Sequence, residues 1–329
     1  MAEAQKIETS TEVSLQEELA ALWRGLPHRG VFLALLAAWV ALFHFLGNSV
    51  LGYVKTDSMF GWLWYVYTTT PDEEHGKLIP VVVLALLVWK RHELMALPKR
   101  IWWPALGLVA LGLLGHAGGY VVQQTRISIV GFVVGLYGLT GLLWGWPWLK
   151  ATFFPVLLFA FSVPISSVLG EHSFPLRILA TSIATWFSHV VLGIPVLQNG
   201  TMIFDANGAY RYDVDVACSG LRSLTAMVAM NTVFAFVMFQ SIWRRGLMLA
   251  AAVPLAVVGN VFRLTAIIFA AETFGHAAGG YVHDNFWLSL LPYVPGIAGT
   301  LLLSHWLRET KGQAKPAAQP VLAGSEQKA

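Results

Sequence analysis

Eight apolar runs recur between residues 31 and 306 of this 329-residue chain, and they constrain its fold more than any other feature. A helix needs about 20 apolar residues to cross the hydrocarbon core of a bilayer. Only 12% of the residues are charged, against about 25% in soluble domains. We therefore predict an all-α polytopic membrane protein. Its roughly eight transmembrane helices are expected at 31–47, 78–89, 101–122, 127–145, 151–169, 219–239, 247–270 and 286–306.

The distribution of Lys and Arg predicts which ends of these helices face the cytoplasm. With the N-terminus inside, eight spans place 14 of the 21 Lys and Arg residues on the cytoplasmic side, in keeping with the positive-inside rule. A ninth apolar stretch, 175–193, is interrupted by polar residues, and counting it as a span would move Arg244 and Arg245 outside. We therefore interpret it as an outer interfacial or re-entrant helix.

Composition divides the chain into three parts. Residues 1–30 are polar and form a predicted cytoplasmic tail, 31–306 form the transmembrane domain, and 307–329 form a cytoplasmic tail that we expect to be disordered. Within the outer material, alternating apolar residues at 201–204 and 210–216 flank an Asn-Gly pair. That pattern is typical of a β-hairpin, so we expect a small outer hairpin before residue 218.

Three reactive or charged residues lie near the outer ends of successive apolar segments. Cys218 is the only cysteine and precedes a span, where a helix N-terminus favours the thiolate. Arg263 lies in the outer part of the next span, because that helix rises about 1.5 Å per residue from the cytoplasmic side. His283 lies in the following outer loop. A thiol, a cation and an imidazole at one depth indicate a thiol-dependent active site at the outer surface of the membrane.

Each of these residues also has an ordinary interpretation. Most free cysteines are small buried apolar side chains, an arginine can extend to the interface, and His283 could be a common loop histidine. Asn260 lies one turn from Arg263 on the same helix face, which favours a polar pocket over a stray cation. The acidic stretch from Asp72 to His75 is interpreted as a solvated loop before a helix, because acidic residues favour helix N-termini.

Five short motifs share a resemblance to one known family. Val216-Ala217-Cys218-Ser219-Gly220-Leu221-Arg222-Ser223-Leu224 resembles the nucleophile motif of the exosortase/archaeosortase family. Asn260-Val261-Phe262-Arg263 is similar to its Asn-x-x-Arg motif, and His283 in a Tyr-x-His context is similar to its third catalytic position. His75-Gly76-Lys77-Leu78-Ile79-Pro80 and Leu192-Gly193-Ile194-Pro195-Val196 resemble two upstream features. The resemblance covers about residues 60–306.

This resemblance implies an exosortase-like domain in the inner membrane that acts as a cysteine transpeptidase, with its active site on the outer face. It makes Cys218 the nucleophile, His283 the general base and acid, and Arg263 the stabiliser of the oxyanion. Asp72-Glu73-Glu74 departs from the more neutral stretch of the family, which bears on substrate choice. The expected supporting or substrate-binding residues are Arg222, Asn260, Ser219, Asp284 and His75.

The implied partners are proteins with a C-terminal sorting signal, in which a short Pro-Glu-Pro-like motif precedes a transmembrane helix and a basic cluster. A lipid amine or a surface glycan would accept the cleaved protein, and membrane lipids surround the enzyme. The resemblance implies no metal or organic cofactor. No nucleic acid is expected either, since the basic residues form no single patch. Two alternatives stay open. One is a membrane protease that only cleaves, and the other is a non-enzymatic transporter or assembly factor for exported polysaccharide, with Arg263 and Asn260 lining a solute path.

Overall fold

The structure is a computed structural model that describes residues 14–50, 54–206, 208–213, 221–285, 287–290 and 293–308. The described chain is mostly helical with one small sheet. The α-helices are α1 (Leu15–Gly25), α2 (Arg29–Phe45), α3 (Met59–Thr69), α4 (Ile79–Trp89), α5 (Arg91–Ala96), α6 (Leu106–Val121), α7 (Thr125–Trp144), α8 (Trp146–Leu157), α9 (Ser166–Val190), α11 (Leu221–Met238), α12 (Ile242–Phe274), α13 (His276–Asp284) and α14 (Tyr293–Trp306). Short 3-10 helices are η1 (Pro71–Lys77), η2 (Trp103–Ala105), η3 (Leu158–Ser162) and η4 (Leu288–Leu290).

Three helices in the described part of the chain are long and apolar enough to cross a membrane. They are Trp103–Val121, α7 and α12. The α1–α2 pair would make a fourth span, although the two helices meet at a bend of 92°. Other predicted spans correspond to shorter helices, such as α4, whose 11 residues extend about 16 Å against a core of about 30 Å. The chain is thus a helical membrane protein, and the number of eight spans stays a prediction.

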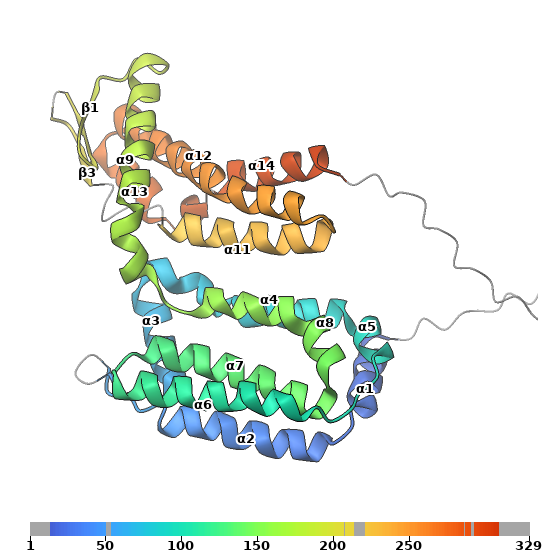
Figure 1. Ribbon diagram of the computed structural model, residues 1–329. Helices are drawn as coiled ribbons and strands as arrows, with labels where there is room; N and C mark the ends of the chain where they lie inside the picture. The colour runs from blue at the N-terminus through green and yellow to red at the C-terminus, as the bar shows by residue number, and fades with distance from the viewer. Residues whose placement is uncertain are drawn as a thin grey trace, which may run out of the picture.

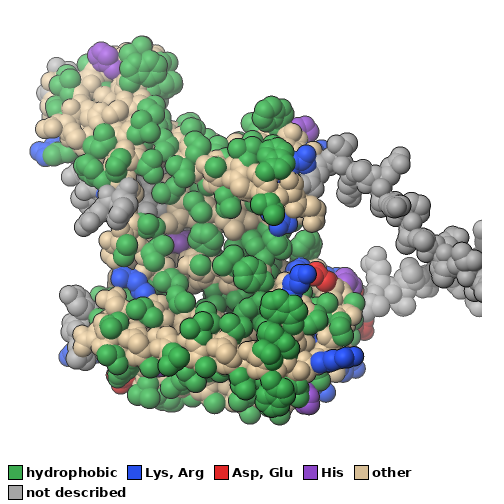
Figure 2. All heavy atoms as spheres, viewed as in Figure 1, with side chains coloured by type: hydrophobic (Ala, Val, Ile, Leu, Met, Phe, Trp, Pro, Cys, Tyr) green, Lys and Arg blue, Asp and Glu red, His purple; other side chains and the backbone are tan. Residues whose placement is uncertain are grey.

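The longer helices run alongside one another, and α9 runs across one end of them (Figure 1). The sheet, α3 and α13 lie at that end, whereas α1 and the last turn of α14 lie at the other (Figure 1). On the face shown in Figure 2, hydrophobic side chains cover the middle and charged side chains gather toward the two ends. This arrangement fits helices that cross a bilayer, with α9 lying in one interface.

The α6–α7 pair is held by close contact between glycines. A Cβ atom on Gly112 would lie 2.7 Å from the Gly131 carbonyl oxygen and 2.7 Å from the Gly135 Cα. The two backbones therefore approach more closely than larger side chains would allow. Small residues four apart are the usual means by which membrane helices pack without a hydrophobic driving force.

The sheet has three antiparallel strands, β1 (Val196–Asn199), β2 (Met202–Asp205) and β3 (Arg211–Asp213). The predicted hairpin is the β2–β3 pair, in which Ile203 lies opposite Tyr212. Its turn is stabilised by Asp205, whose carboxylate accepts a hydrogen bond from the Ala209 N–H at 3.1 Å. The sequence analysis missed β1, which reaches β2 through a tight turn at Gly200 with a φ of +61°, a conformation that glycine adopts without strain.

Most of the stretch 175–193, interpreted as interfacial or re-entrant, belongs to a longer helix that starts nine residues earlier, at Ser166, and ends at Val190. This helix, α9, is not among the candidate spans of the described chain. Ala180 and Ala184 are fully buried in α9 and share a core cluster with Leu264 and Ile268 of α12. Small residues on α9 therefore let it lie directly against the C-terminal half of α12, which positions the site described below.

The two tails are only partly described. Residues 15–25 of the predicted N-terminal tail form helix α1, and Ser14 and Glu17 make a capping box at its start. Glu18 of α1 pairs with Arg91 of α5, so this segment docks on the body of the protein. Residues 1–13 and 309–329, including the predicted disordered tail, lie outside the described residues.

Candidate active site

Arg263 of α12 is the best-defined residue of the predicted site. Its guanidinium Nη2 donates a hydrogen bond to the backbone carbonyl of His283 at 3.1 Å, which joins α12 to α13. Its Nε is buried and has no hydrogen-bond partner in the described part of the chain. A buried donor left without a partner calls for an explanation, such as a catalytic role or a bound water. One N–H group of Arg263 therefore joins the two helices, and its Nε–H is left to bind a ligand.

His283 lies on a helix, which corrects its predicted place in a loop. Helix α13 contains it, and Gly275 with a φ of +88° separates α13 from α12. The sheet supports α13, since the Tyr212 hydroxyl donates to the His276 carbonyl at 2.9 Å. A Cβ on Gly279 would lie 2.2 Å from that hydroxyl. A side chain larger than glycine would therefore push α13 off the sheet and move His283.

A second tyrosine, Tyr210, fixes the sheet to α12. Tyr210 is only 4% exposed, and its hydroxyl donates to the Glu272 carboxylate at 3.3 Å. Burial raises the pKa of Tyr210, and the charge of Glu272 raises it further. The phenol therefore stays protonated and keeps this hydrogen bond at ordinary pH.

The predicted nucleophile, Cys218, and its neighbour Ser219 lie outside the described residues. Helix α11 begins at Leu221, so the cysteine precedes it by three positions in the chain. Arg222 lies in the first turn of α11. Asp284 is the last residue of α13.

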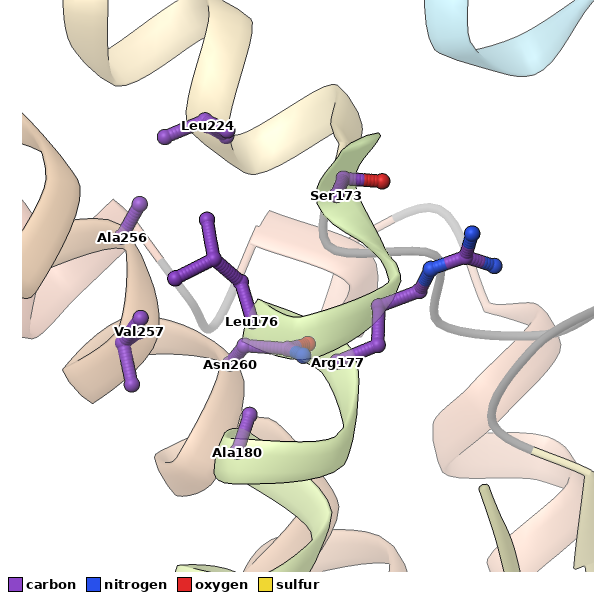
Figure 3. A pocket seen from close by; sticks show the side chains of 8 residues that line it. All are labelled: Ser173, Leu176, Arg177, Ala180, Leu224, Ala256, Val257 and Asn260. Atoms are coloured by element: carbon purple, nitrogen blue, oxygen red, sulfur yellow. The ribbon is translucent and has the colours of Figure 1, made fainter. Parts of the chain in front are cut away.

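A cleft opens between α9, α11 and α12, and it includes predicted site residue Asn260 (Figure 3). Its cavity volume is about 20 Å³, which is room for about one water molecule. Figure 3 shows Leu176 pointing toward Leu224 and Ala256, while the Asn260 side chain, which is 4% exposed, reaches toward α9. The cleft is apolar with a few polar groups, as in many binding sites. It is lined by Ser173, Leu176, Arg177, Ala180, Leu224, Ala256, Val257 and Asn260.

The acidic stretch predicted to be a solvated loop is the 3-10 helix η1, and its members differ. Glu73 is 3% exposed and accepts a hydrogen bond from the Ser166 N–H at 2.6 Å, at the start of α9. Burial with a partner overturns the solvated interpretation for this residue. Glu74 is exposed and forms an ion pair with Arg222 at 3.9 Å. His75 contacts the Asp72 carbonyl within η1 at 3.1 Å, and no contact between His75 and Arg263 or His283 is found in the described residues.

The α9 wall of the cleft, where Ser173 and Arg177 lie with Asn260, was not expected from the sequence. The polar interruptions of the stretch 175–193, Arg177 among them, were the available signal for this wall.

The arrangement combines two guanidinium groups, one of which has a spare donor, with an imidazole-bearing helix and a cleft. Such donors stabilise an oxyanion or bind a carboxylate. In comparisons with known proteins, a family model described as transmembrane exosortase (Exosortase_EpsH) matches residues 64–292. No curated protein and no solved structure matches the chain. This family model spans more than half of the sequence, including every predicted catalytic position. The chain therefore belongs to the transmembrane exosortase family.

Proposed function

We propose that this protein is a cysteine transpeptidase that removes the C-terminal sorting signal from exported proteins. Family membership supports a membrane transpeptidase of protein sorting. The observation that carries the catalytic assignment is Arg263, which is fixed to α13 beside His283 and has an unpartnered Nε. In this proposal, the stretch that leads into α11 brings Cys218 to the same place.

The chemistry begins with attack of the Cys218 thiolate on a backbone carbonyl carbon of the substrate. The carbonyl oxygen becomes an oxyanion that Arg263 stabilises with its charge and its spare N–H. The oxyanion then collapses, the C–N bond breaks, and His283 as the imidazolium gives its proton to the leaving amine. The product is a thioester between the substrate and Cys218, and the transmembrane signal departs as the new amine.

A second nucleophile resolves the thioester. Neutral His283 takes the proton of a lipid amine or a glycan hydroxyl while that group attacks the thioester carbonyl, and the Cys218 thiolate leaves. Attack by water in place of this acceptor would give proteolysis alone. The positive charge of Arg263 favours the thiolate both as nucleophile and as leaving group.

In this proposal the short sorting motif lies at the mouth of the cleft between α9, α11 and α12, because the cleft itself is narrow, with room for about one water molecule. Its walls reach from the first turns of α11, at Leu224, to Asn260, which lies one turn from Arg263. In the proposed topology, both termini are cytoplasmic, the cleft opens at the outer face of the inner membrane, and α9 lies in the interface. The substrate helix would cross beside the enzyme, and its basic cluster would hold the register at the cytoplasmic side.

The test is the intact mass of a co-expressed protein that ends in motif, helix and basic cluster. Wild-type enzyme is expected to remove the helix, and Cys218→Ala is expected to leave the substrate whole. Thr232→Val is the matched control on α11, because the Thr232 hydroxyl donates only to Val228 within that helix. Added mass on the new C-terminus would indicate transfer, and its absence would indicate hydrolysis. Full processing by Cys218→Ala would contradict the proposal.

A further inference from the structure

Two adjoining apolar grooves lie along α7, apart from the cleft that includes Asn260. One has a volume of about 210 Å³ between α7 and the α8–η3 segment. The other has a volume of about 310 Å³ between α7, α3 and the residues that join η1 to α4. Val133 and Phe159 line both, so the two form one continuous groove. From Ile129 to Tyr137 it follows α7 for about 12 Å.

One end of this groove carries a cation without a counter-ion. Lys77 lines the groove and is half-buried, and no hydrogen bond or ion pair of its ammonium is found within the described residues. The acidic residues of η1 are engaged elsewhere. Glu73 accepts from the Ser166 N–H, Glu74 pairs with Arg222, and Asp72 has an interaction of its own.

A second cation, Arg126, lies in the first turn of α7. It donates through Nε to the Pro164 carbonyl at 2.5 Å and through Nη2 to the Ser167 hydroxyl at 2.8 Å, next to the groove residue Val163. The groove therefore has an apolar length and a cationic end. That combination complements a molecule with a long apolar chain and an anionic head, and basic pockets between membrane helices recognise such lipids.

We propose that this groove binds one anionic phospholipid of the leaflet next to the candidate active site. The phosphate lies at Lys77, and an acyl chain follows α7 past Val133. The aromatic rings of Trp64 and Tyr67, which also line the groove, suit the level of the lipid head groups. A substrate helix fits this place poorly, because its motif must reach the cleft between α9, α11 and α12.

The proposed lipid would act on the helix that supports the active site. Helix η1 carries Lys77, and it also holds the start of α9 through Glu73 and contacts α11 through Glu74. A head group at Lys77 therefore restrains an element that touches both α9 and α11. Binding itself does not depend on the proposed function and can be measured without a substrate.

The first experiment is native mass spectrometry of the full-length protein in detergent, with phosphatidylglycerol or phosphatidylcholine added. Wild type is expected to retain phosphatidylglycerol preferentially. Lys77→Gln is expected to weaken that retention about fivefold. Lys55→Gln, which removes an exposed cation before α3, is the matched control and should change nothing. Equal retention of the two lipids by wild type, or equal effects of the two substitutions, would overturn the proposal.

A second set of variants tests the acyl chain. Val133→Phe narrows the groove where its two parts meet and should lower retention of phosphatidylglycerol. Val258→Phe places the same ring on an exposed position of α12 and should not. Inorganic phosphate should neither bind at Lys77 nor raise the melting temperature. If phosphate raised the melting temperature as much as phosphatidylglycerol does, the site would bind free anions and the lipid assignment would be wrong. A photo-crosslinker at Val130 should capture lipid, and capture of a substrate helix or of a second copy would also refute the assignment.

Discussion

The α6–α7 and α11–α12 pairs are both hairpins of apolar helices, yet they are held together differently. In α6–α7 the backbones meet at Gly112 and Gly131. In α11–α12 a polar side chain joins the helices, since the fully buried Asn231 donates from Nδ2 to the Met248 carbonyl at 3.2 Å. Asn231 also accepts from the Thr300 hydroxyl of α14 at 2.7 Å.

The difference teaches how to separate structural from chemical polar residues in a membrane helix. Unsatisfied polar groups are costly away from water. Asn231 has partners on two other helices and serves packing. Arg263 of α12, in contrast, keeps a buried donor without a partner in the described chain. Other buried atoms of the described chain, among them the Thr265 hydroxyl of α12, also lack a partner. It is therefore the contact with His283 that sets Arg263 apart.

The largest effect is expected from Arg263→Gln. Loss of the guanidinium removes the proposed oxyanion donor, so the rate of sorting-signal release should fall about 10²–10³-fold. Thermal unfolding in detergent should change little by comparison, and Arg263→Lys should restore part of the rate because it keeps the charge. The rate is measured by gel or mass analysis of substrate in proteoliposomes. An unchanged rate for Arg263→Gln would erase the distinction between Arg263 and Asn231.

A stability effect with no specific effect on chemistry is expected from Gly131→Val. A Cβ atom at position 131 would lie 2.6 Å from the Gly112 carbonyl oxygen and 3.0 Å from the His116 backbone nitrogen. Overpacking of this kind costs about 1–3 kcal/mol, occasionally more, and should lower the melting temperature. Gly107→Val on α6 is the control, because a Cβ at Gly107 meets nothing within 4 Å. Similar melting temperatures for the two variants would show that α6 and α7 do not depend on this contact.

The sequence predicted the features that follow from local pattern and charge. Apolar runs located α6, α7 and α12, alternation around Asn-Gly located the β2–β3 hairpin, and helical spacing brought Asn260 and Arg263 to one region of α12. The number of spans is less certain from pattern alone, since α4 is apolar throughout but short. Length, not composition, limits that prediction.

The features that were missed depend on contacts between distant segments. Residues 276–284 contain glycines and looked like a loop, but Tyr212 packs against Gly279 and holds them as a helix. Glu73 looked solvated, but the start of α9 approaches it and supplies a backbone N–H. Tertiary packing in each case outweighs local propensity, and a single sequence does not reveal such pairs.

The smallest effect is expected from Glu74→Gln, which tests whether the acidic departure in η1 tunes the candidate site. Glu74 and Arg222 are 46% and 36% exposed and lie 3.9 Å apart, so solvent weakens their attraction. Removal of the Glu74 charge frees Arg222 to pair with an acidic residue in the substrate motif. The KM for an acidic motif should fall by up to about fivefold, and that gain should shrink in high salt.

The same comparison with a neutral motif makes this effect specific. The KM for a substrate whose motif carries Gln in place of Glu should be the same for wild type and Glu74→Gln, because Arg222 then has no charge to bind. Asp57→Asn, which removes an exposed carboxylate near α3, controls for the general change in surface charge. If Glu74→Gln changes the KM for the acidic and the neutral motif alike, Glu74 acts only on the packing of η1. Its ion pair with Arg222 is then a structural contact, like those of Asn231.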